Sequence, residues 1–481
     1  MSDFAAIVAF LILVYVRPQE WIPGVGFLRP GVVTMIWAVA AMVMRSSPRP
    51  VRLRDLFRTP HDYVMWAFFL WMAFATPPMW DTFNANKSFL VFYFATVNIL
   101  TDRNRIEGFL WWWAAMILFI CLLGIGVELG FDPTNARDIM EGRMQGRLVL
   151  GMSIFNNPNA LGHGIAPVAP MVYYLMFWRR PFSVRALALA LLPLPAFCLF
   201  LTESKGAYIS SAFALAGGLI FGRPRVVQII MLVIAVNVGG AVLYRLPRME
   251  VMRGGRASAK EEGVAGRVFA FRYGWDVYHR DTRGVGKDRF NRSIERERNW
   301  WISPHSVYVQ VGAELGATGL FLYLGILYFS MKSLCLASCG SEQEERIRRV
   351  LMGAFLAFCM SGWLITFTYR AHFFLQAGAV AAFHRLLLRK GRDETEVEPQ
   401  PAGMLSLAGP CEPPSPSPLY CAPGHGLFGR RHGYLAMVTD VPARMPGIRK
   451  DWNRLTVFDV VALLAVNKVV LMIWSFVITQ V

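Results

Sequence analysis

Long apolar segments alternate with short polar connections along most of this chain. Each segment approaches the roughly 20 residues that an α-helix needs to cross a bilayer. The pattern predicts an all-α, polytopic integral membrane protein with about 12 transmembrane helices. The apolar segments lie near residues 4–16, 31–44, 62–79, 87–100, 107–128, 159–178, 186–201, 206–221, 226–244, 316–332, 350–368 and 372–388.

One long polar stretch, near residues 246–305, interrupts this pattern. It carries a dense set of arginines and lysines, and apolar segments bracket it on both sides. Irregular backbone inside hydrocarbon would leave its polar groups unsatisfied, so the stretch is predicted to be a large loop at one membrane face. Arginines also cluster in the even-numbered connections between the apolar segments. The positive-inside rule therefore places these connections and the N-terminus in the cytoplasm, and the large loop on the outer side of the membrane.

The composition changes beyond the last of these segments. Residues 391–454 are rich in Pro, Gly and Ser, which predicts a disordered cytosolic linker because such a segment buries too little apolar surface to offset its chain entropy. Residues 455–481 are apolar but include Asp459 and Lys468. They form either a thirteenth span, which we favour, or an amphipathic helix on the membrane surface. We expect residues 1–390 to be the working domain and a chain ending near Lys390 to keep its activity.

Composition agrees with a membrane protein, since 55% of the residues are hydrophobic, 17% are charged and the mean hydropathy is +0.40. The net charge of +17 comes largely from short loops between apolar segments, where cations set topology and meet anionic headgroups. No compact basic domain is left over for nucleic acid.

Arg17 and Pro18 follow the first apolar run in place of a cleavage site, which predicts a retained helix. The seven cysteines have no CxxC spacing, so no metal or other cofactor is predicted.

Four short polar stretches fall on the predicted outer side, and each has a structural explanation when taken alone. In the first, Asn159 would accept hydrogen bonds from the free amides at the start of a helix. In the second, Lys205 would extend to lipid headgroups. The third would be an amphipathic helix on the membrane surface, and in the fourth His305 would be a structural histidine at a helix start. The stretches are residues 151–161, 201–207, 266–290 and 303–310.

Taken together, the four stretches indicate a reaction centre. Lys205, Arg267 and His305 come from separate parts of the chain that the predicted topology places at one membrane face. Two cations can bind a diphosphate, and a histidine can exchange a proton near neutral pH. Gly284 and Gly286 would let the backbone approach a ligand closely, although the absence of a preceding predicted strand excludes a Rossmann or P-loop site.

These stretches resemble, in the same order, the motifs of the O-antigen ligase and O-antigen polymerase superfamily. That family has about twelve spans and a large periplasmic loop late in the chain, and the resemblance covers roughly residues 1–390. Departures from the family pattern are the spacing around Ile154, Gly162 where alanine is usual, Lys205 in place of arginine and Ser306 in place of asparagine. The similar segments are Gly151 to Gly162, Thr202 to Gly206, Gly266-Arg267 with Trp275, Gly284-Val285-Gly286 with Phe290, Pro304 to Gln310, and Glu314 to Leu320.

The resemblance implies a metal-independent glycosyltransferase of the bacterial inner membrane with its active site on the periplasmic side. It would take a glycan from undecaprenyl diphosphate and pass it to an acceptor hydroxyl during the synthesis of a surface polysaccharide, such as O-antigen and lipopolysaccharide or an exopolysaccharide. It would act as a ligase or as a polymerase. The acceptor stays open between lipid A core, another glycan and a protein side chain.

The resemblance also assigns roles to individual residues. His305 would orient or deprotonate the acceptor hydroxyl. Lys205 and Arg267 would hold the donor diphosphate, assisted by Arg272. The lysine supplies a point charge and lacks the bidentate geometry of an arginine. The supporting residues would be Asn157, Asn159 and Glu314.

Two other classes of protein remain as alternatives. A transporter or flippase for lipid-linked sugars would more often place ionisable groups inside its helices near the midplane, and the predicted helices are almost free of such groups. A purely structural membrane protein would leave the four polar stretches unexplained. An assay in detergent separates the three classes, because only an enzyme makes a new glycosidic bond there.

Overall fold

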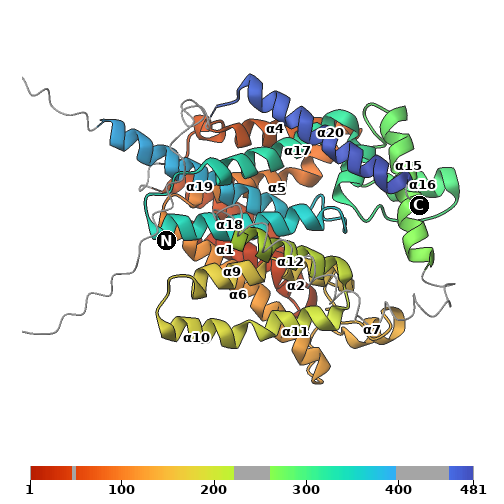
Figure 1. Ribbon diagram of the computed structural model, residues 1–481, viewed down its shortest axis with the longest axis horizontal. Coiled ribbons are helices and arrows are strands. Elements are labelled where there is room, and N and C mark those ends of the chain that lie inside the picture. The colour runs from red at the N-terminus through yellow and green to blue at the C-terminus, as the bar shows by residue number, and fades with distance from the viewer. Residues whose placement is uncertain (1, 46–49, 221–260, 397–453, 480–481) are drawn as a thin grey trace, which may run out of the picture.

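The computed structural model describes residues 2–45, 50–220, 261–396 and 454–479, and every regular element among these residues is a helix (Figure 1). The long helices pack side by side in one bundle, as the apolar segments predicted. The elements before the first long gap are α1 Ser2–Tyr15, α2 Pro18–Trp21, η1 Gly26–Leu28, α3 Pro30–Met44, η2 Leu53–Leu56, α4 Pro60–Ala75, α5 Met79–Ile99, α6 Arg103–Glu128, α7 Arg137–Arg143, α8 Pro158–Ile165, α9 Val168–Val172, η3 Tyr173–Phe177, α10 Phe182–Leu191, α11 Pro193–Thr202 and α12 Lys205–Ile220. Those after it are α15 Glu261–Arg280, α16 Phe290–Arg298, α17 Val307–Leu336, α18 Glu342–Ser361, α19 Ala371–Glu396 and α20 Val457–Thr479.

Six helical stretches among the described residues are long and apolar enough to cross a membrane. Two shorter apolar helices, α1 and α3, lie beside them. The chain is therefore helical and polytopic in character, whereas the number of twelve spans stays a prediction. The segment predicted at 226–244 and most of the linker predicted at 391–454 lie outside the described residues. The six stretches are Arg103–Glu128, Pro158–Phe177, Phe182–Thr202, Val307–Leu336, Ala371–Arg389 and Val457–Thr479.

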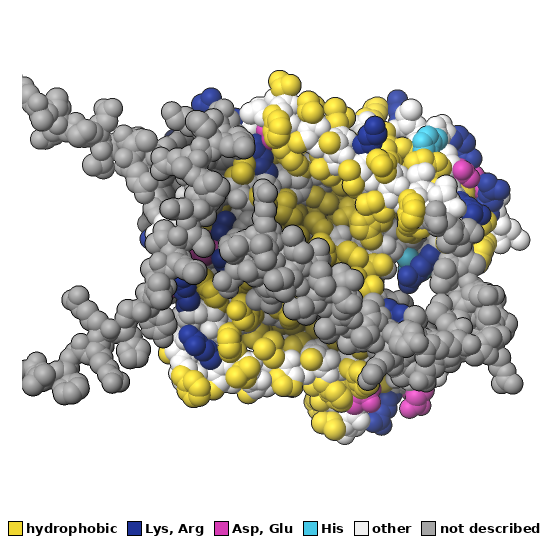
Figure 2. All heavy atoms as spheres, viewed as in Figure 1, with side chains coloured by type: hydrophobic (Ala, Val, Ile, Leu, Met, Phe, Trp, Pro, Cys, Tyr) yellow, Lys and Arg dark blue, Asp and Glu magenta, His cyan; other side chains and the backbone are white. Residues whose placement is uncertain are grey.

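The surface of the bundle has the distribution of side chains that a bilayer requires. Figure 2 shows hydrophobic side chains across the middle of one face, with Lys and Arg side chains toward both ends. Large apolar side chains are exposed on α3, α11 and α20, for example Ile36, Phe200 and Phe476. Such exposure is costly in water and favourable in lipid, so these helices are among those whose surfaces suit contact with hydrocarbon.

The two ends of the bundle differ in their chemistry. The N-terminus lies at one end, and α15 and α16 lie at the other (Figure 1). We call the N-terminal end the basic end, because Arg45, Arg105 and Arg385 lie there. There the fully buried Asp62 accepts from Arg385 Nη2 at 2.7 Å and from Tyr93 Oη at 3.1 Å. It also caps α4 by accepting from Thr59 N at 2.8 Å. A buried carboxylate needs such a set of donors, because leaving it unpaired would cost several kcal/mol, on the order of 3–5.

Several helix boundaries differ from those that the apolar pattern predicted. The segment predicted at 186–201 consists of two helices, because Pro193 and Pro195 lack the amide hydrogens that would continue α10 into α11. The segment predicted at 316–332 starts at the kink of α17, where Gly316 has a φ angle of 65° and a ψ angle of −168°, and a helical stretch capped by Ser306 precedes it from Val307. A helix can include polar residues at its ends, so the apolar pattern alone predicts a shorter element than the helix that forms.

Candidate functional site

The Asn-Pro-Asn sequence begins α8 and ties it to the connection between α11 and α12. Asn157 is the capping residue and accepts from Asn159 N at 2.9 Å. The prediction that Asn159 would cap is therefore wrong. Asn159 Oδ1 instead accepts from Ser204 Oγ at 2.9 Å and from Arg147 Nη2 at 3.1 Å. This pair of bonds fixes the short turn that carries Lys205.

Two glycines allow α8 and α12 to pack closely at this point. A Cβ atom on Gly162 would lie 2.7 Å from the Cβ atom of Ala207, which explains why the usual alanine is absent here. A Cβ atom on Gly206 would lie 2.9 Å from His163 Nε2. Lys205, which is partly buried, is the first residue of α12 and directly precedes Gly206, the residue that packs against His163.

His163 was not singled out from the sequence, because it stands in an apolar helix and resembles a core residue. It is buried, and its Nδ1 lies 2.8 Å from Ser361 Oγ at the end of α18. The next residue along, Gly362, accepts from Ser306 Oγ at 3.0 Å and from Val307 N at 2.7 Å. One turn between α18 and α19 therefore holds both His163 and the start of α17.

His305 precedes α17 in a strained conformation. Its φ angle is 48°, in the left-handed region that residues other than glycine rarely adopt. The fixed positions of Ser306 and Val307 on either side of the turn at Gly362 maintain this conformation. Strain of this kind often accompanies a functional group. Serine in place of the family's asparagine leaves the helix cap intact, since Ser306 Oγ still accepts from Val309 N.

Arg267 of α15 lies close enough for its charge to act on both His305 and His163. Burial, and next the positive charge of Arg267, lower the pKa of His305 to about 4. The imidazole is therefore neutral near pH 7 and can accept a proton or a hydrogen bond. It forms no hydrogen bond to another described residue. The charge of Arg267 thus acts on both histidines, and Gly206, the residue after Lys205, packs against His163.

The glycines at 284 and 286 have a different role from the predicted one. Val285 N donates to Ala313 O at 3.0 Å, and Gly286 N donates to Glu314 O at 2.8 Å. Gly284 has a φ angle of 73°, and a Cβ atom there would overlap the Glu314 backbone. These glycines let the loop approach the backbone of α17 closely. The close approach that was predicted for a ligand is therefore made to α17.

Glu314 links this loop to α16 and to the turn before α19. Its buried side chain accepts from Phe290 N at 3.2 Å and from Gln310 Nε2 at 3.2 Å. Gln310 in turn accepts from Thr368 Oγ1 at 2.7 Å. The carboxylate therefore joins α16 and α17, with Gln310 extending the connection to the turn before α19, which is the geometry of a structural support.

A test of this packing is Gly316→Ala. α17 is kinked at Gly316, which has φ 65° and ψ −168°, and a Cβ atom there would overlap Thr282 O. The strain costs about 1–3 kcal/mol before any clash is counted, so thermal unfolding of the purified variant should begin at a lower temperature. Gly142→Ala is the control, because no other atom lies within 4 Å of its added carbon. Equal melting temperatures for both variants would contradict the packing.

Arg272 does not join the other candidates. It is exposed, and its Nη2 donates to Ile478 O at 3.2 Å. Five residues correspond to about 140° of rotation around an α-helix, so Arg272 and Arg267 lie on different faces of α15. The structure thus places Arg272 against the last turn of α20.

The contact with α20 involves more than Arg272. Trp474 is fully buried and donates from Nε1 to Phe271 O at 3.0 Å. A Cβ atom on Gly312 of α17 would lie 2.9 Å from the indole ring, and one on Gly274 of α15 would lie 3.2 Å from it. At the basic end Asp459 pairs with Lys332 of α17 at 2.7 Å. α20 therefore packs along α17 and holds α15, which argues against the prediction that a chain ending near Lys390 keeps its activity.

We expect Trp474→Ala to lower turnover about 10- to 100-fold, because a shift of roughly 1 Å in catalytic groups has effects of this size. The measurement is activity and thermal stability for Trp474→Ala and Trp474→Phe, the second of which keeps a ring between Gly274 and Gly312. Phe476→Ala is the control, since Phe476 is on the same helix and 61% exposed. Full activity of a folded protein without α20 would restore the earlier prediction.

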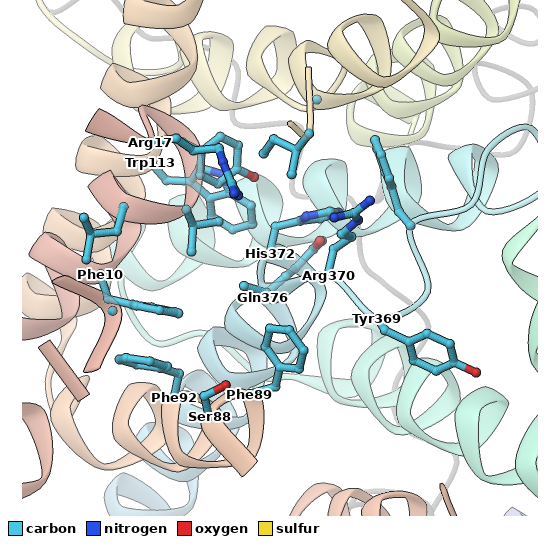
Figure 3. A pocket seen from close by; sticks show the side chains of 18 of the residues that line it. Phe10, Arg17, Ser88, Phe89, Phe92, Trp113, Tyr369, Arg370, His372 and Gln376 are labelled. Carbon is cyan, nitrogen blue, oxygen red and sulfur yellow. The ribbon is translucent and has the colours of Figure 1, made fainter. Parts of the chain in front are cut away.

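A cavity of about 670 Å³ lies next to the turn that holds His163. Aromatic side chains of α1, α5 and α6 line much of it, and His163 and Ser361 form part of its wall. Figure 3 shows Arg17, Arg370, His372 and Gln376 around it. In the described parts of the chain no group of three or more His, Cys, Asp or Glu side chains is placed to hold a metal ion.

Comparison with known proteins adds one match. Residues 186–324 match the family model described as O-antigen ligase. This confirms the resemblance to the O-antigen ligase and polymerase superfamily that the motifs indicated. No curated protein matches the chain. The matched range contains Lys205, Arg267, Arg272, His305 and Glu314, whereas Asn157, Asn159 and His163 precede it.

Proposed function

Because the chain matches the O-antigen ligase family, we propose that it transfers a glycan from undecaprenyl diphosphate to an acceptor hydroxyl at the periplasmic face of the bacterial inner membrane. The observation that carries this proposal is the packing of α15 against the residues before α17, where a Cβ atom on Gly266 would lie 2.6 Å from the Ile302 side chain, so that the charge of the next residue, Arg267, acts on His305. A fixed cation and a group able to accept a proton are what such a transfer needs. The product is a surface polysaccharide, made by ligation or by polymerisation.

In the proposed reaction the acceptor oxygen attacks the anomeric carbon of the donor sugar. A new carbon–oxygen bond forms while the bond from that carbon to the diphosphate breaks, and undecaprenyl diphosphate leaves with the electron pair. Arg267 stabilises the negative charge that grows on the leaving group, and Lys205 adds a second positive charge. No metal ion is required for this step.

His305 takes the proton of the acceptor hydroxyl. In the free protein its pKa of about 4 makes it a weak base. When a donor diphosphate is bound to Arg267, its negative charge offsets the cation that disfavours the imidazolium form. The donor therefore raises the basicity of His305 at the stage when a base is needed. Asn157, Asn159 and Glu314 keep these groups in position through the bonds described above.

The direct test is transfer by the purified full-length protein in detergent. Lipid-linked glycan and candidate acceptors, namely lipid A core, a second lipid-linked glycan and a peptide with hydroxyl side chains, are supplied separately. Appearance of a new glycosidic bond with one of them identifies the acceptor class. A deletion strain gives a second measurement: free lipid A core on a lipopolysaccharide gel indicates a ligase, and single repeat units on the core indicate a polymerase. Failure of all three acceptors would contradict the proposed function.

One observation favours a transporter as the second candidate function. His61 and His384 are buried at the basic end, and Ser333 Oγ lies 2.7 Å from His384 Nδ1 and 3.4 Å from His61 Nε2. The expectation that the helices are almost free of ionisable groups concerned the middle of the spans, whereas these two histidines lie at one end of the bundle. Movement of lipid-linked glycan across vesicles without bond formation would support this alternative.

A further inference from the structure

The cavity beside His163 has an apolar wall and a basic side. Phe10, Phe89, Phe92 and Trp113 contribute to the wall, and Arg17 and Arg370 contribute the charge. Figure 3 shows the two guanidinium groups reaching toward the same space. A volume of about 670 Å³ is within the range of sites that bind small organic molecules.

The two arginines carry more positive charge than their surroundings balance. Arg17 pairs with Glu20, whose carboxylate also accepts from Ser153 N at 2.7 Å, and Arg17 Nε has no partner among the described residues. The side chain of Arg370 makes no hydrogen bond or ion pair to any residue that the structure describes. Burial, and next the charge of Arg17, lower the pKa of Arg370. An anion between the two guanidinium groups would remove this repulsion.

A second, independent observation also indicates a ligand. Gln376 lines the cavity, is 3% exposed, and its Nε2 has no hydrogen-bond partner among the described residues. A buried donor without a partner is unfavourable and uncommon in folded proteins. An oxygen of a bound anion would satisfy it.

We propose that this cavity binds an anionic lipid, with Arg17, Arg370 and Gln376 donating to its phosphate oxygens and the aromatic wall holding its hydrocarbon chain. Phosphate oxygens suit paired guanidinium groups, and a site lined by apolar side chains suits a lipid chain. The inference rests on the proposed function, because the carrier lipid and a lipid A acceptor are both anionic lipids. His163 joins the two regions, since it lines the cavity and lies within the field of Arg267.

The test measures lipid binding to the purified full-length protein by native mass spectrometry. The probes are undecaprenyl diphosphate, lipid A and phosphatidylglycerol, with undecaprenol as the neutral lipid of the same chain length as the carrier. We expect Arg370→Gln to weaken binding of at least one phosphorylated probe about 10- to 100-fold and to leave undecaprenol binding unchanged. Arg179→Gln is the matched control, because Arg179 pairs with Glu342 at the basic end and does not line the cavity.

The probe that depends on Arg370 identifies the source of the phosphate. Loss of undecaprenyl diphosphate indicates the donor carrier, loss of lipid A indicates the acceptor, and loss of phosphatidylglycerol indicates a lipid of the bilayer. Each of these results supports the site. Equal binding of all phosphorylated probes by the wild type and by Arg370→Gln would overturn it.

Gln376→Leu gives a measurement that does not depend on arginine. It removes an unsatisfied buried donor, so the lipid-free protein should unfold at the same or a higher temperature while binding of the phosphorylated probe weakens. Unchanged binding in this variant would remove Gln376 from the site. The site and the proposed function fail separately: Arg370-dependent binding without any transfer by the wild type overturns the function alone, and transfer without Arg370-dependent binding overturns the site alone.

Discussion

Replacing His305 by alanine should lower the turnover of glycan transfer about 100- to 10,000-fold, which is the usual contribution of general acid–base catalysis. The donor should still bind, because the proposed contacts to its diphosphate come from Arg267 and Lys205. Turnover and donor affinity of the purified variant are measured side by side with those of the wild type. Near-normal turnover at an unchanged protein level would make His305 a structural residue at the start of α17.

The pH dependence gives a second measurement on His305. Its pKa of about 4 in the free protein means that kcat/KM, which reports ionisations of free enzyme and substrate, should be level from about pH 8 to pH 5. It should fall as the pH drops through about 4, because protonated imidazole cannot accept the acceptor proton. A decline already complete at pH 6 would show that the imidazole is not in the environment described here.

Arg267→Ala should lower kcat about 100- to 1000-fold, by analogy with the loss of one donor to a developing oxyanion. The interaction grows as charge develops on the diphosphate, so the loss appears in kcat as well as in kcat/KM. Removing the cation also removes a cause of the low pKa of His305, and the acidic decline of kcat/KM should therefore move to higher pH. A shift of the acidic decline to higher pH shows that the charge of Arg267 has been lost from the site, because a variant that merely misfolds loses activity at every pH.

Matched variants narrow the interpretation of Arg267→Ala. Arg280→Ala is the control on the same helix, because Arg280 is exposed and pairs with Glu297, and exposed pairs contribute little to stability. Lys205→Arg should be tolerated and Lys205→Ala should not, since the position needs a positive charge. Equal kcat for Arg267→Ala and Arg280→Ala would exclude Arg267 from the diphosphate site.

The candidate site shows which relationships a sequence can reveal. Lys205, Arg267 and His305 were found because each stands in a polar stretch at the end of an apolar segment, where a charge needs an explanation. His163 and Gln376 lie inside apolar segments, so the pattern gave no reason to separate them from ordinary helix residues. Arg370 stands in the short connection before the last segment, where no motif singled it out. Their importance depends on residues more than a hundred positions away, such as Ser361, whose hydroxyl lies 2.8 Å from the His163 ring, and Arg17, whose charge acts on Arg370.

By itself the sequence indicated a helical, polytopic chain and placed Arg267 and His305 away from the N-terminal end, because hydropathy can be read from neighbours along the chain. Only the tertiary structure decided that Gly284 and Gly286 pack against α17, that Arg272 lies apart from Arg267, and that Trp474 holds α15 against α17. The physical reason is that side-chain packing and buried hydrogen bonds join segments far apart in the chain. The periodicity of apolar and polar residues along the chain does not indicate which segments pack against each other.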